Sequence, residues 1–147
     1  MSGFQTDLLT GLAVYLAAGG LQATWSPTGE YTALQTGIVI RNVPPAPDRI
    51  ITLTAYPVSD SPALSDSVLG LQVRCRWGGQ DPRPVDDLSD AIFNLLHGKT
   101  TLTLSTGVTV VQCLRQSAKT LGQDDNLRWS NAHNYYLTVH RPSTNRT

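Results

Sequence analysis

Apolar residues recur at helical spacing in two segments of the chain, residues 4–18 and residues 85–96. Pro82 and Pro84 precede the second segment and Gly98 follows it, as expected at the start and the end of a helix. The sequence therefore predicts two amphipathic helices. Their apolar positions are Phe4, Leu8, Leu9, Leu12, Tyr15 and Leu16 in the first, and Val85, Leu88, Ile92, Leu95 and Leu96 in the second.

Strict alternation predicts a strand at residues 69–77, where every second residue is apolar or aromatic. A segment with three prolines at residues 43–48 and a polar segment at residues 57–67 are expected to be loops. Runs rich in β-branched and apolar residues predict the remaining strands. These lie at residues 21–25, 37–41, 49–56, 101–105, 108–116 and 134–140.

Strands joined in hairpins, together with two helices that must each cover an apolar stripe, predict an α+β fold in two layers. We expect a mostly antiparallel sheet of about five to seven strands, with both amphipathic helices packed on one face. A chain of 147 residues is long enough to bury a core without a disulfide or a metal. We expect a single domain over residues 1–142 and a flexible C-terminal tail at residues 143–147.

A polar segment at residues 114–128 separates the last two predicted strands, and we expect a loop over residues 117–131. Long loops without secondary structure are uncommon in compact domains unless they have a function. The segment has no layout of a catalytic or metal site, so we expect it to contact another protein. Its charged residues are the candidate assembly interface, as local or intersubunit ion pairs: Arg115, Lys119, Asp124, Asp125 and Arg128.

Charged residues make up only 15% of the chain, against about 25% in average soluble domains. A surface poor in charge is easily desolvated by a partner, although abundant threonine also suits an ordinary β-rich domain. The net charge is zero, which argues against nucleic acid as the main partner. No apolar run approaches the length of a membrane span, and the first residues do not have the pattern of a signal peptide. We expect a cytoplasmic site of synthesis and no membrane partner.

Catalytic and metal-binding patterns are absent from the sequence, which contains no nucleophile elbow, zinc motif or phosphate loop. His97 ends a predicted helix, while His133 and His140 are seven residues apart without a third ligand. Cys75 and Cys113 have neither a redox nor a zinc spacing, and we expect buried free thiols. We therefore expect no enzyme activity, no cofactor and no metal, and we assign no catalytic residue.

Short motifs along most of the chain, together with the order of predicted elements, resemble one known family. The motifs lie at residues 25–31, 37–38, 47–56, 73–79, 81–82, 96–98, 116–117, 121–124 and 134–136. In this order, and in a chain of this length, they resemble the tail terminator and minor capsid (tail completion) proteins of long-tailed bacteriophages. The residues after Pro142 match no part of that pattern.

The resemblance implies a structural virion protein at the neck, on top of the tail, assembled in the cytoplasm of a host bacterium. Such proteins form a ring, usually of six copies, on the head-proximal end of the tail tube. They stop tube polymerisation and provide the docking surface for head-completion proteins. The partners implied are further copies of the chain, the tail tube protein and a head-completion or stopper protein.

Three alternatives remain open from the sequence. The first is another neck component, such as a head-closure or stopper protein, although those are often small β-barrels and two helices argue against that fold. The second is a small-molecule enzyme on an α+β scaffold. The third is direct DNA binding: Arg74 and Arg76 share a strand face with Gln72 and are candidates to face a channel through which a genome passes, where their contact with DNA would be passive. Both arginines can instead be solvated or pair with acidic residues of a neighbour.

Overall fold

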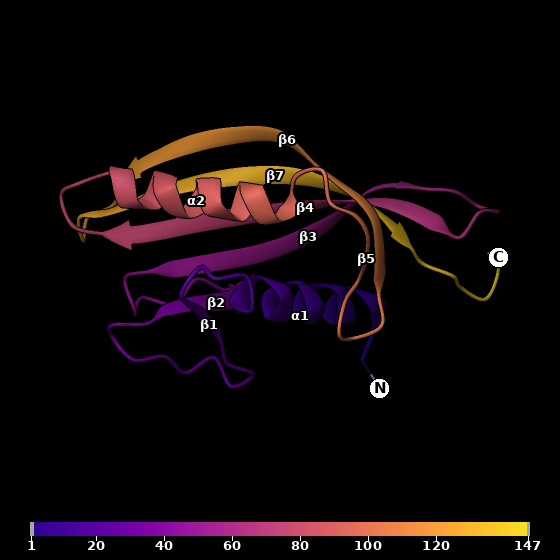
Figure 1. The fold of residues 1–147 in the computed structure, drawn as a ribbon, viewed down its shortest axis with the longest axis horizontal. Helices are drawn as coiled ribbons and strands as arrows, with labels where there is room; N and C mark the ends of the chain where they lie inside the picture. The colour runs from indigo at the N-terminus through magenta and orange to yellow at the C-terminus, as the bar shows by residue number, and fades with distance from the viewer. Residues whose placement is uncertain (1, 147) are drawn as a thin grey trace.

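The computed structural model describes residues 2–146, which form two helices and seven strands (Figure 1). Both predicted helices are confirmed, and among the described residues no helix has the length and apolar character needed to span a lipid bilayer. The elements are α1 (Phe4–Ala17), β1 (Ala23–Trp25), β2 (Thr36–Ile40), β3 (Ile50–Asp60), β4 (Asp66–Gly78), α2 (Arg83–Leu96), β5 (Thr100–Thr103), β6 (Thr109–Gln123) and β7 (Arg128–His140).

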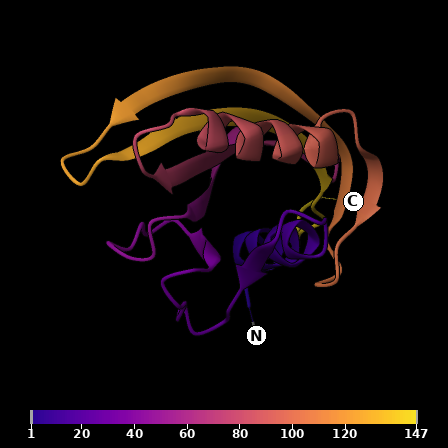
Figure 2. The same ribbon diagram turned by 60° about the vertical axis from the view of Figure 1, so that its left-hand side comes forward.

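The strands of the described residues form one curled sheet in the order β1-β2-β3-β4-β7-β6-β5 (Figure 2). The sheet is mixed, so the prediction of a mostly antiparallel sheet was wrong. β1, β2 and β3 run parallel to one another, whereas the other neighbouring strands pair antiparallel. The parallel part arises because long connections at residues 26–35 and 41–49, rather than tight hairpin turns, return the chain to the same end of the sheet.

Residues of both helices and of the sheet belong to one hydrophobic cluster. α1 packs against β1, β2 and β3, and α2 packs against β4, β6 and β7. The Tyr15 hydroxyl on α1 donates a hydrogen bond to the Leu95 carbonyl on α2 at 2.9 Å, which links the two helices. Gly11 stands within α1 because a Cβ there would lie 2.7 Å from the Cβ of Leu104. Packing against the β5–β6 connection therefore explains a glycine that lowers intrinsic helix propensity.

The β3–β4 hairpin is longer than the sequence predicted. Residues 57–67 were expected to form a loop, but pairing continues to Asp60 opposite Ser67, and only residues 61–65 connect the strands. Pro57 is tolerated because β2 covers β3 only as far as Leu53, so Pro57 lies where β3 is an edge strand. A register shift between Pro57 and Ser59 then obscures the alternation of side chains.

The predicted loop at residues 117–131 was also wrong, since most of this segment is strand. β6 pairs with β7 as far as Gln123 opposite Trp129, which leaves a turn of residues 124–127. Register shifts interrupt the pairing at three points along β6, and each one moves the following side chains out of strict alternation. The polar residues that suggested a loop instead belong to a long, exposed strand.

Arg76 holds the proline-rich connection at residues 41–49 against the sheet. The Arg76 side chain is buried, and its Nε donates to the Asp48 carbonyl at 3.0 Å. One Nη of Arg76 donates to the carbonyls of Pro44 and Pro47 at 2.8 and 2.7 Å. Prolines have no N–H, so the chain offers mainly carbonyl oxygens here, and a guanidinium supplies the matching donors.

The C-terminal residues 143–146 turn back on the chain, with Ser143 bridged to Arg146. An Nη of Arg146 donates to the Ser61 carbonyl at 3.1 Å and lies 3.9 Å from the Asp60 carboxylate. These contacts join the turn to the end of the β3–β4 hairpin. Flexibility of the tail at residues 143–147 stays a prediction, and Thr147 lies outside the described residues.

Arg76→Met should lower the free energy of unfolding by about 2–4 kcal/mol, because it leaves three carbonyls without their charged donor. The matched control is Arg74→Met on the same face of β4, where the buried Nε has no hydrogen-bond partner within residues 2–146. We expect the control to cost less than about 1 kcal/mol. Urea unfolding followed by circular dichroism measures both, and equal losses would contradict the role assigned to Arg76.

Candidate assembly surface

The β6–β7 turn is organised by one carboxylate. One oxygen of Asp124 accepts hydrogen bonds from the backbone N–H groups of Asn126 and Arg128 at 2.9 and 3.0 Å. Its other oxygen accepts from Nε of Arg128 at 2.9 Å. The backbone hydrogen bond from Arg128 is the main cause that lowers the pKa of Asp124, so the carboxylate stays ionised at neutral pH. The local ion pair that the sequence suggested is therefore present inside one subunit.

Arg128 extends from this turn to the proline-rich connection. It is only 8% exposed, its Nη1 donates to the Pro45 carbonyl, and its guanidinium lies 3.8 Å from the Asp48 carboxylate. A residue expected on an open assembly loop is thus an internal link between two segments. Its charge, together with burial as the larger cause, also lowers the pKa of Arg76.

Arg115 lies on β6, within the strand predicted at residues 108–116, and its side chain contacts α2. Its guanidinium stacks over the Phe93 ring, with Cζ 4.3 Å from the ring centroid, and Phe93 stacks in turn on His97 at 4.6 Å. The backbone N–H of Arg115 donates to Nδ1 of His97 at 3.0 Å. This arrangement attaches the C-terminal end of α2 to the middle of β6, with a cation–π contact as one component.

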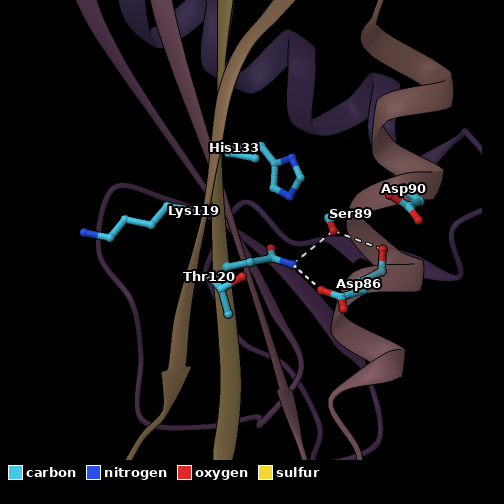
Figure 3. Close-up of a pocket in the computed structure, with 8 residues that line it drawn as sticks. Asp86, Ser89, Asp90, Lys119, Thr120 and His133 are labelled. Carbon is cyan, nitrogen blue, oxygen red and sulfur yellow. Dashed lines mark hydrogen bonds between the residues drawn. The ribbon is translucent and has the colours of Figure 1, made fainter.

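Lys119 and Asp125 remain exposed, as the assembly prediction requires. Figure 3 shows the Lys119 side chain directed away from α2. Lys119 is paired with Ala132, and Ala132 with Arg74, so these side chains share the face of the sheet opposite the core. Asp125 lies in the β6–β7 turn. The five candidate residues are therefore divided between an internal framework and an open surface.

A polar groove separates α2 from the β6–β7 hairpin (Figure 3). Nδ2 of the buried Asn131 donates to Oγ of Ser89 at 3.0 Å and to a carboxylate oxygen of Asp86 at 3.2 Å. Burial, and then the charge of Arg115, lower the pKa of His133 in the same groove, so its ring is neutral at pH 7. Hydrogen bonds across the groove, between neutral and anionic side chains, attach α2 to the sheet. The polar residues of this part of the sequence gave no indication of that role.

Arg74 and Arg76 share one face of β4, as expected from their spacing. Arg76 is 4% exposed and is committed to the proline-rich connection, whereas Arg74 is half-buried between Thr52 and Ala132. Orientation toward a channel stays a prediction for both residues.

Exposed leucines, which no sequence pattern distinguishes from core leucines, mark the ends of the two long hairpins. Leu64 at the β3–β4 turn is 68% exposed, and Leu127 at the β6–β7 turn is 57% exposed. Leu121, near the end of β6, is 42% exposed. Large apolar side chains in water at projecting turns are typical of contact residues, although single ones are common on any surface.

Cys75 and Cys113 are buried free thiols, which confirms the prediction from their spacing. Burial raises the pKa of each to about 12, so neither is a thiolate nucleophile at neutral pH. Within residues 2–146 there is no group of three His, Cys, Asp or Glu side chains that could hold a metal ion. The residues described above are better suited to contacts between protein surfaces than to nucleophilic catalysis or metal binding.

Comparison with known proteins agrees with this picture. A family model described as "Bacteriophage tail terminator protein" matches residues 15–141. Among solved structures, a chain from the "Virion of native gene transfer agent (GTA) particle" has the same fold, with a TM-score of 0.58 and 19% identity over 93% of this chain and 98% of that chain. No curated protein sequence matches. The chain belongs to the bacteriophage tail terminator family, and it is a structural component of the virion tail.

Proposed function

We propose that this protein forms a ring, of six copies, that caps the head-proximal end of the tail tube, stops tube polymerisation and presents a docking surface to head-completion proteins. The observation that carries the proposal is the family match over residues 15–141. The low content of charged residues supports it, because an extensive contact surface must be desolvated on assembly.

The shape of the molecule is consistent with two different partners. The β3–β4 hairpin and the β6–β7 hairpin project at opposite ends of the long axis (Figure 1). Each turn carries an exposed leucine, Leu64 at one end and Leu127 at the other. A terminator must match the tube on one side and differ from it on the other, and two unlike hairpins provide such a pair of surfaces. Arg74, rather than the buried Arg76, is the candidate for passive contact with DNA that passes through the ring.

The purified protein should form closed rings, alone at high concentration or on the ends of isolated tail tubes. A ring requires heterologous contacts, in which each copy offers a different surface to each neighbour. Analytical ultracentrifugation and negative-stain electron microscopy measure this directly. A chain that stays monomeric and also leaves tube ends bare would contradict the proposal.

Deletion of the protein from its phage should give DNA-filled heads and separate tails of mostly excessive length. A tube whose subunits add head-to-tail has no intrinsic stop, because each new ring exposes the same acceptor surface. Electron micrographs of the deletion strain give the distribution of tail lengths, and complementation with the intact protein is the control. Tails of normal length beside heads that leak DNA would instead identify a head-closure protein.

Asp125→Ala should leave the thermal unfolding transition unchanged but reduce the yield of infectious particles, because its exposed carboxylate is available to a partner. Asp124→Ala is the matched contrast and should lower the melting temperature, because the turn loses the acceptor of two backbone N–H groups. Calorimetry and plaque assays separate the two effects. The turn is not an assembly surface if Asp125→Ala particles form in normal numbers.

A further inference from the structure

The outer edge of β6 is open along the second half of the strand. β5 pairs with β6 only from Thr109 to Gln112, and no strand of the described residues pairs with that edge from Gln116 to Gln123. Most side chains of this segment are exposed. The backbone N–H and C=O groups on an open edge form a template for another strand.

A second open edge lies on β3, which is separated from β6 by β4 and β7 in the sheet. β2 pairs with β3 only as far as Leu53. The exposed residues 56–60 pair with β4 on one side and with no strand of the described residues on the other side. Gln5 donates to the Ala55 carbonyl at 3.4 Å, so α1 occupies the edge at Ala55 and the open part of the edge begins after it.

We propose that β6 residues 116–123 of one copy pair with β3 residues 56–60 of the next copy, so that one sheet continues from subunit to subunit. This inference rests on the proposed ring and assigns its subunit contact. Strand direction permits it: β3, β4, β7 and β6 alternate in direction, so the β6 of one copy meets the β3 of an identically oriented neighbour antiparallel. Every contact is heterologous, as a ring requires.

Charge at the two edges is sparse, so the two edges do not repel each other. The β6 segment contains one charged residue, Lys119, and the β3 segment contains one, Asp60. Pro57 and the register shifts on both strands limit how many backbone groups can pair. A proline and register shifts on an open edge discourage nonspecific aggregation between edges. The contact that remains possible is short and requires a partner edge of matching geometry.

The offset between the two open edges suits a curved, closed sheet. Within one subunit, Ser117 is at the same height along the sheet as Thr54, with β7 and β4 between them. The open part of β6 is therefore level with the part of β3 that β2 covers. The neighbour must therefore slide along the strands by about five residues, roughly 16 Å. That is about one residue per strand, the stagger of eight-stranded barrels with a strand tilt of about 36°.

Disulfide cross-linking between separate copies tests the contact. Ser59→Cys protein is mixed in turn with Ser117→Cys and with Lys119→Cys protein, since these three residues share the face opposite the core. Under mild oxidation, at least one mixture should give about tenfold more linked dimer than the control mixture, because disulfides require closely placed Cβ atoms. The control pairs Ser59→Cys with Thr28→Cys, an exposed position in the connection between β1 and β2. The native Cys75 and Cys113 are buried.

The same samples are imaged by negative stain and melted by calorimetry. Rings or capped tubes with cross-linking no greater than in the control would overturn the edge pairing and leave the proposed function standing. Absence of both rings and capped tube ends with the unmodified protein would overturn both. The result that supports the contact is cross-linking in the folded, ring-forming variants that is lost when Ala118→Pro is added to the Ser117→Cys copy, because the backbone N–H of Ala118 lies on the open edge.

Discussion

The ladder between β4 and β7 is the constraint on which the other elements depend. It runs without a register shift from Asp66 opposite His140 to Gly78 opposite Arg128. One face of this ladder carries buried side chains such as Leu71 and Tyr135, which join the core beneath the helices. Because both strands are long, their partners β3 and β6 extend beyond the helix-covered region at opposite ends. The two hairpins therefore follow from the length of the central pair.

Two buried arginines provide the hydrogen-bond donors that the proline-rich connection at residues 41–49 needs in order to pack against the sheet. A segment with few N–H groups cannot join a strand ladder, and its carbonyl oxygens would lose hydrogen bonds if they were buried without donors. Arg76 and Arg128 supply donors from two neighbouring strands. Two cations so close together repel, and Asp48 and Asp124 offset that repulsion. The end of the sheet is thus stabilised by a polar network rather than by apolar packing.

The sequence predicted those elements whose side-chain periodicity is regular. Both helices have apolar stripes bounded by proline or glycine, and the alternating residues of β4 all lie in a strand. The ends of β3 and β6 were missed because register shifts and exposed polar residues remove the alternation that identifies a strand. Arg128 was placed on the surface because nothing local reveals a carbonyl-rich segment more than eighty residues away in the sequence. Long-range satisfaction of polar groups, and the direction of β1 and β2, depend on tertiary contacts that one sequence does not display.

The depth of the two thiols has a consequence for the durability of the particle. A released virion spends its life in aerated surroundings without the reducing systems of a cell. Cys75 and Cys113 remain protonated because burial raises their pKa to about 12, and peroxides react with thiolates far faster than with thiols. Oxidation of either thiol is therefore expected to be slow as long as the protein stays folded.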